Sequence, residues 1–218
     1  MSSSLPRILL TGFDPFGGES INPSWEAVRT LQGKRMGGHL IVAQQLPTEF
    51  AGSLRELKAA VREMAPTIML GVGQAGGRQQ LSIERVAINV QDARIPDNAG
   101  GQPVDEPVIA GGPAAYLSTL PIKAMLAALQ AHGVPAEISN SAGTYVCNHI
   151  AYAMLHLAAK RRGTRAGFIH IPYLPAQAAK RHGVASMALA DVVRGLEMAL
   201  RTAIATPLDH KLGAGKLD

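Results

Sequence analysis

The sequence predicts an α/β fold: a single-domain three-layer α/β/α sandwich with a largely parallel twisted sheet. Short apolar runs alternate with amphipathic segments of helical period from the N-terminus onward, and this alternation is typical of parallel strands joined by helices. The chain has 218 residues, of which 47% are hydrophobic, and this suits one core. No internal repeat or interdomain linker divides it, so residues 1–218 are expected to form one domain.

The expected strands are short apolar runs that stop at a glycine, a proline or a turn of small residues. The first run stops at Gly12, and the third opens into the glycine-rich turn Gly71–Gly77. In chain order, the expected strands cover residues 7–11, 40–43, 67–70, 81–90, 136–139 and 167–171.

The expected helices carry apolar side chains at spacings of three and four residues, which places these side chains on one helical face. The first helix follows the capping residue Asn22, with Pro23 at the first helical position. In chain order, the expected helices cover about residues 23–31, 50–64, 122–129, 147–157 and 186–204. The polar tail at about 207–218 is expected to fray.

The charge balance favours neither nucleic acid nor membrane as a partner. Lys and Arg exceed Asp and Glu by a net +5, but the one basic cluster, residues 160–165, lies at an expected helix end, where cations complement the helix dipole. No apolar stretch approaches the roughly 20 residues of a membrane span. An RNA-binding α/β domain remains an alternative that the positive charge would fit.

Cysteine content and the N-terminus indicate the compartment. Cys147 is the single cysteine, which excludes an internal disulfide framework and a zinc site built of several thiolates. The first seven residues lack the basic and apolar regions of a signal peptide. We therefore expect a cytoplasmic protein that uses no cofactor and no metal.

A glycine-rich turn offers a second alternative, a nucleotide-dependent enzyme. Residues 71–76 fit the dinucleotide fingerprint G-x-G-x-x-G, and Asp97 lies at the required offset beyond Gly76. The fingerprint needs a helix directly after the turn, whereas the segment that follows has the pattern of a strand. The sequence therefore favours a different use of this turn.

Cys147 is the candidate nucleophile. It follows an expected strand and a turn of small residues, Ser141 to Gly143, and it lies where a helix begins. The free N–H groups and the dipole at a helix N-terminus favour a thiolate, and they can also bind an oxyanion. A buried cysteine without chemical function is the alternative.

Among the seven histidines, His170 is the candidate general acid and base. It ends the apolar strand at 167–171, at the edge where the turn before Cys147 should emerge. His149 is the rival, but it lies two residues beyond Cys147 on the same helix, so the two side chains point to different faces. A buried histidine that is bonded to the backbone is the other reading of His170.

Glu84 is the candidate for the group that orients the imidazole. On a strand it shares a face with Val86, Ile88 and Val90, and a carboxylate on an apolar face is costly unless it is paired. Arg85 points to the opposite face, so a histidine from another strand is the expected partner. The pairing could also be purely structural.

Seven sequence blocks occur in the same order as in a known family. They are Gly12-Phe-Asp-Pro-Phe-Gly-Gly18, Asn22-Pro-Ser-Trp-Glu26, Val72-Gly-Gln-Ala-Gly-Gly-Arg78, Glu84-Arg-Val-Ala-Ile-Asn89, Arg94-Ile-Pro-Asp-Asn98, Ser141-Ala-Gly-Thr-Tyr-Val-Cys-Asn148 and Gly167-Phe-Ile-His-Ile-Pro-Tyr173. Together they resemble the type I pyroglutamyl peptidases, also called pyrrolidone-carboxylate peptidases. The resemblance covers about residues 7–205.

This resemblance implies a cytosolic, metal-independent cysteine peptidase that removes an N-terminal pyroglutamyl residue from peptides and commonly assembles as a homotetramer. The implied triad is Cys147 as nucleophile, His170 as general acid and base, and Glu84 as the orienting carboxylate. The pocket for the lactam ring maps onto Phe13, Phe16, Gln74, Ile95, Tyr145 and Val146, with Asn22 as a weaker candidate. Many relatives have phenylalanine where this chain has Tyr145, and Arg94 is left outside the triad.

Overall fold

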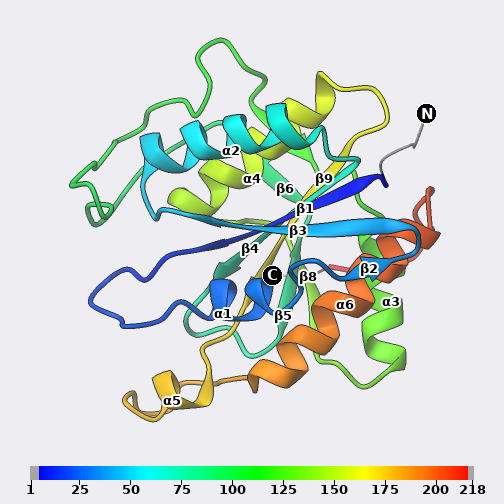
Figure 1. Ribbon diagram of the computed structural model, residues 1–218. Helices are drawn as coiled ribbons and strands as arrows, with labels where there is room; N and C mark the ends of the chain where they lie inside the picture. The colour runs from blue at the N-terminus through cyan, green and yellow to red at the C-terminus, as the bar shows by residue number, and fades with distance from the viewer. Residues whose placement is uncertain (1–4, 216–218) are drawn as a thin grey trace.

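A sheet of seven strands runs through the computed structural model, which describes residues 5–215 (Figure 1). The strand order is β2-β3-β1-β4-β9-β5-β8. In chain order these strands are β1 (Arg7–Phe13), β2 (Arg35–Met36), β3 (His39–Leu46), β4 (Ile68–Gln74), β5 (Leu81–Glu84), β8 (Ala136–Ser139) and β9 (Arg165–Ile171). Strands β3, β1, β4 and β9 are parallel, whereas β5 pairs with β9 in the antiparallel sense and β8 runs parallel to β5.

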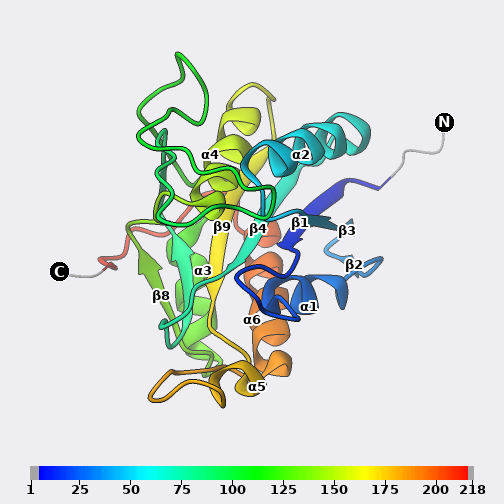
Figure 2. The same cartoon turned by 90° about the vertical axis from the view of Figure 1, so that its left-hand side faces the viewer.

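Helices cover both faces of this sheet, so the predicted three-layer arrangement is confirmed (Figures 1 and 2). Helices α2 (Phe50–Met64) and α4 (Val146–Ala159) pack on one face, and their apolar side chains share a core cluster with Leu9, Met69 and Phe168. The opposite face is covered by α1 (Pro23–Arg29), α3 (Ile122–Ala131) and α6 (Leu189–Ala205). The short helix α5 (Pro175–Ala178) lies at one end of the molecule.

The prediction of one continuous strand at residues 81–90 is wrong. This segment is β5 in the main sheet followed by β6 (Val86–Ile88), which pairs with β7 (Ala115–Leu117) in a separate two-stranded sheet. At Arg85 the chain changes its pairing from β8 to β7. The N–H of Arg85 donates to the O of Ser139, the last residue of β8, and its C=O accepts from the N–H of Ser118, which follows β7. The apolar pattern continues across Arg85, so the sequence alone gives no sign of the break.

The part of the tail that the structure describes, residues 207–215, lies against the domain. The Asp209 carboxylate accepts hydrogen bonds from the N–H groups of Lys123 and Ala124 in the first turn of α3. The carbonyl of Ala214 accepts from Arg85 Nη2 at 2.7 Å and from Lys123 Nζ at 2.9 Å. These contacts differ from the expected fraying, and residues 216–218 of the predicted tail lie outside the described residues.

Close packing at Gly12 brings β1 against α1. A Cβ atom at this position would lie 2.8 Å from the backbone of Ser24 and Trp25, and backbone atoms cannot turn aside as a flexible side chain can. We expect Gly12→Ala to lower the free energy of unfolding by about 1–3 kcal/mol through overpacking, measured by urea denaturation. Gly213, with open space around its Cα, provides the control Gly213→Ala, and equal losses in the two variants would contradict this reading.

Candidate active site

The sheet register brings His170 and Glu84 together on the face that α2 and α4 cover. His170 pairs with Gly73 of β4 on one side and with Ser82 of β5 on the other. Since β5 is antiparallel to β9, Glu84 lies two residues farther along β5 and on the same face as Ser82. Its Oε1 atom is 2.7 Å from His170 Nδ1, and both side chains are almost completely buried. The pairing expected for this carboxylate is therefore present.

Cys147 lies in the first turn of α4, next to the same strands. A Cβ atom at Gly73 would lie 2.8 Å from Cys147 Sγ and 2.9 Å from the ring of Phe168. The missing side chain at Gly73, which is the register partner of His170, leaves the space that the sulfur occupies. The sheet thus brings the thiol beside the Glu84–His170 pair. Within the described residues no side chain caps the N-terminus of α4, so no side chain occupies the free backbone N–H groups of the turn that carries the sulfur.

Arg78 is a fourth side chain at the site and carries the charge opposite to that of Glu84; no pattern in the sequence identified it. Its Nη1 donates to Glu84 Oε1 at 2.8 Å, the same oxygen that contacts His170. Its Nη2 donates to the carbonyl of Ser141 at 3.1 Å, in the turn that leads to Cys147. The only sequence signal was that Arg78 ends a block of the family resemblance. One guanidinium therefore links the carboxylate to the turn that precedes the thiol.

The electrostatic surroundings keep the thiol and the imidazole neutral. Burial raises the pKa of Cys147 to about 12; the charge of Glu84 adds to the rise, and Arg78 opposes it. Burial also lowers the pKa of His170, while its hydrogen bond with Glu84 and the charge of Glu84 act in the opposite direction, and Arg78 lowers the pKa further. The helix end predicts a lowered pKa for Cys147, but burial, which the sequence did not reveal, has the larger effect. At neutral pH the neutral imidazole is available as a base.

A small cavity opens beside Cys147. Its volume is about 10 Å³, roughly the space of one water molecule. It is lined by Phe13, Phe16, Asn22, Thr48, Gln74, Tyr145, Val146 and Cys147. Six of the seven residues predicted for the ring pocket thus gather here, together with Thr48, which the sequence analysis missed because it lies in none of the recognised blocks.

Ile95, the seventh predicted pocket residue, lies in an adjoining open pocket. This pocket of about 420 Å³ also contains Arg94, and it shares Phe16 and Tyr145 with the small cavity. The rings of Phe16 and Tyr145 have centroids 6.4 Å apart, so these two side chains form the partition between the two spaces. The Tyr145 hydroxyl donates to Pro96 O at 3.0 Å, which ties the partition to the loop that carries Ile95.

Asn22 lines the cavity, but its side chain already makes local hydrogen bonds. Oδ1 accepts from the N–H and the hydroxyl of Ser24, and Nδ2 donates to the carbonyl of Asp14. As the N-cap of α1, it holds the loop that carries Phe16. Asn22 therefore stabilises the wall of the cavity through contacts within the protein.

The nucleotide-binding alternative finds no support at residues 71–77. The turn expected there is wrong for its first four residues, because residues 71–74 are the end of β4. The next element after the glycines is the strand β5, whereas the fingerprint requires a helix there. The carboxylate of Asp97, which would contact a ribose, instead accepts hydrogen bonds from the N–H groups of Phe50, Ala99 and Gly101. It anchors its own loop to the start of α2.

His149, the rival base, lies away from the thiol. It is 3% exposed and packs edge-on against Phe50, with ring centroids 5.5 Å apart. It lines a different cavity, between α2 and the loop that contains Gln91 and Asp97. Its position therefore supports packing and not proton transfer at Cys147.

A thiol, an imidazole–carboxylate pair and a helix N-terminus on an α/β sheet have the composition of a cysteine-type hydrolase. A model of the family described as pyroglutamyl peptidase matches residues 6–206. A pyrrolidone-carboxylate peptidase from Erwinia tasmaniensis is 55% identical over 97% of this chain and 99% of its own, and one from Klebsiella pneumoniae is 54% identical over 95% and 97%.

Solved structures agree with this assignment. The crystal structure of pyroglutamyl peptidase I from Bacillus amyloliquefaciens is 46% identical, with a TM-score of 0.92 over 96% of this chain and 100% of that one. The pyrrolidone carboxyl peptidase from Thermococcus litoralis, at 36% identity, gives 0.90 over 92% and 94%. The chain belongs to the pyroglutamyl peptidase family and is a hydrolase, a cysteine peptidase. Within residues 5–215, no helix combines the length and apolar character needed to cross a membrane.

Replacement of His149 separates stability from catalysis. Burial lowers its pKa to about 4, below the ordinary 6.5, so the unfolded chain takes up this proton first as the pH falls. Because of this histidine, the free energy of unfolding of the wild type should fall by about 2–3 kcal/mol as the pH is lowered from about 7 to 4.5. We expect His149→Phe to remove that loss, measured by urea unfolding at both pH values, and to stay active at neutral pH. The exposed His132 supplies the control His132→Phe, and an inactive but folded His149→Phe would contradict the assignment.

Proposed function

We propose that Cys147, His170 and Glu84 carry out the hydrolysis of the amide bond after an N-terminal pyroglutamyl residue and release pyroglutamate from the blocked peptide. The observation that carries this assignment is the 2.7 Å contact between His170 and Glu84, beside a thiol that lines a small, largely apolar cavity. Pyroglutamate is a neutral cyclic amide, so its recognition needs burial and hydrogen bonds, not a charged partner.

The reaction begins with a neutral thiol and a neutral imidazole. His170 takes the proton of Cys147 as the sulfur attacks the pyroglutamyl carbonyl, and the N–H groups at the start of α4 stabilise the oxyanion. The imidazolium, held by Glu84, then gives its proton to the departing amine, which leaves a thioester on Cys147. A water molecule that is deprotonated by His170 attacks this thioester, and pyroglutamate and the free thiol are regenerated.

The lactam ring enters the small cavity when the partition formed by Phe16 and Tyr145 moves aside. A five-membered lactam needs far more space than the roughly 10 Å³ that the free protein offers, so the side chains of Phe16 and Tyr145 must separate. Phe13, Val146 and Gln74 then contact the ring, Asn22 supports the wall, and Ile95 covers the ring from the adjoining pocket. The peptide beyond the ring leaves through that open pocket, past Arg94.

The remaining proposals concern cell compartment and assembly. The catalytic role of the thiol requires a reducing compartment, which supports action in the cytoplasm. The family resemblance supports a homotetramer, and large apolar side chains that are more than half exposed offer surface for subunit contact; among the described residues these are Ile95, Val104, Leu117, Leu208 and Leu212.

Turnover of a fluorogenic pyroglutamyl amide tests the assignment. We expect activity in the wild type, with reductant and EDTA present, and none in Cys147→Ala. His170→Ala and Glu84→Gln should lower kcat/KM by about 10²–10⁴-fold without unfolding the chain. The exposed Glu63 provides the charge-matched control Glu63→Gln. Full activity in Glu84→Gln would remove this carboxylate from the mechanism.

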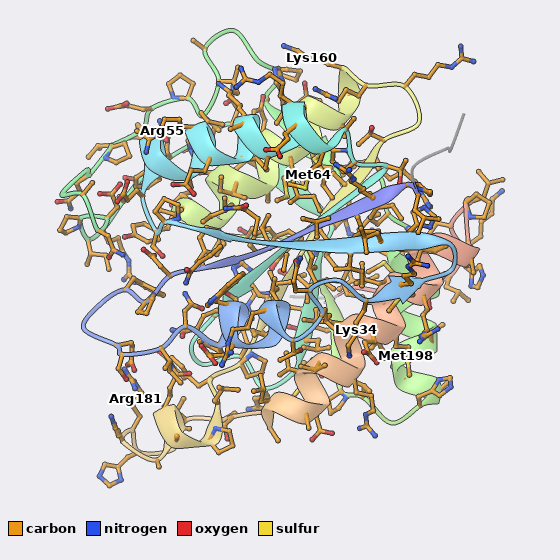
Figure 3. The ribbon with its side chains drawn as sticks, viewed as in Figure 1. Lys34, Arg55, Met64, Lys160, Arg181 and Met198 are labelled. Atoms are coloured by element: carbon orange, nitrogen blue, oxygen red, sulfur yellow. The ribbon has the colours of Figure 1, made fainter. Side chains whose placement is uncertain are left out.

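The pH profile of kcat/KM distinguishes the two charges beside His170. Glu84 raises and Arg78 lowers the pKa of this imidazole, and the base must be neutral to act. We therefore expect the acid limb to lie below pH 6.5, to move to higher pH in Arg78→Gln and to lower pH in Glu84→Gln. Arg55→Gln, on the outer surface of α2 (Figure 3), is the control. Shifts of the same sign in the two variants would overturn this electrostatic account.

A further inference from the structure

The side-chain amide of Gln177 has a fixed orientation. Gln177 is 3% exposed, and its Oε1 accepts a hydrogen bond from the backbone N–H of Leu174 at 3.1 Å. A backbone N–H can only donate, so the atom that faces it must be the oxygen. The amide nitrogen of Gln177 must then point the other way, toward Gln74.

A second anchor requires the same orientation. Gln177 also donates to the carboxylate of Glu19, whose pKa is lowered first by its hydrogen bond with Arg181 and further by the one with Gln177. A carboxylate at neutral pH can only accept. Arg181 binds Glu19 by a charged hydrogen bond and lies over the ring of Tyr173, at the end of the molecule formed by the α5 segment (Figure 3).

The fixed amide of Gln177 in turn orients the side-chain amide of Gln74. Gln177 Nε2 donates to Gln74 Oε1 at 3.1 Å, so the oxygen of Gln74 is directed away from the ring cavity that this residue lines. Among residues 5–215, no group accepts a hydrogen bond from Gln74 Nε2. The chain of contacts therefore leaves Gln74 with an unused donor, not an acceptor.

We propose that Gln177 is a positioning residue for specificity: it holds the amide of Gln74 so that Nε2 donates to the carbonyl of the lactam ring. This inference rests on the proposed function. The lactam ring differs from a proline ring by that carbonyl, and proline would leave Nε2 without an acceptor. A site whose polar groups are left unpaired rejects such an analogue far more strongly than an apolar wall does.

Gln177→Met tests the proposal, since it keeps the length of the side chain and removes all its hydrogen bonds. We expect KM for the fluorogenic pyroglutamyl amide and Ki for 2-pyrrolidone, the free ring, to rise about tenfold, as loss of one hydrogen bond predicts. The value of kcat should stay within about threefold, because the reacting groups are unchanged. Gln130→Met, at an exposed position on α3, is the matched control.

A double-mutant cycle shows whether Gln177 acts through Gln74. Gln74→Ala combined with Gln177→Met should give the same KM and Ki as Gln74→Ala alone. Fully additive effects, or wild-type KM and Ki in Gln177→Met, would overturn the proposal. If Gln177→Met does not fold, Glu19→Ala removes the second anchor, and Arg181→Met is the control for the loss of the ion pair. A rise in KM and Ki at constant kcat that is larger in Glu19→Ala than in Arg181→Met supports the proposal, and equal values in the two variants overturn it. A wild type that does not turn over the pyroglutamyl amide refutes the proposed function instead.

Discussion

The buried carboxylate of Glu84 is the constraint on which the site depends. A charge on the covered face of a sheet is tolerated only if it is paired, and here one oxygen contacts both His170 and Arg78. The antiparallel pairing of β5 with β9 is what brings this carboxylate beside His170. The carboxylate also fixes the imidazole, because Nδ1 is committed to Glu84 and only Nε2 remains for chemistry.

Small residues create the space in which this pair meets the sulfur. Cβ atoms at Gly71 and Gly73 would lie 2.4 Å from Phe168 and 2.8 Å from Cys147 Sγ. The glycines of β4 therefore serve the packing of neighbouring side chains, although their spacing imitates a nucleotide-binding turn. Because β4 carries no side chain at these two positions, the ring of Phe168 and the sulfur of Cys147 lie in one layer beside the strand.

In the proposed function, two separate features control the ring pocket. The partition of Phe16 and Tyr145 governs entry, and it is attached to the loop that carries Ile95 through the hydroxyl of Tyr145. The amides of Gln177 and Gln74 govern what is accepted once the ring has entered. The first depends on movement of side chains and the second on fixed polarity, so entry of the ring and choice of substrate depend on different side chains.

The sequence by itself determined the layers of the fold and the chemical identity of the site. Apolar runs and helical periods gave most elements, and a carboxylate on an apolar strand face indicated that Glu84 needs a partner, because these are local consequences of side-chain polarity. The antiparallel course of β5 and β8, the break at Arg85, and the roles of Arg78, Thr48 and Gln177 were decided only by the tertiary structure. Each of these depends on which distant backbone or side chain lies opposite, and burial, which sets the pKa of Cys147 and His170, exists only once the layers have packed.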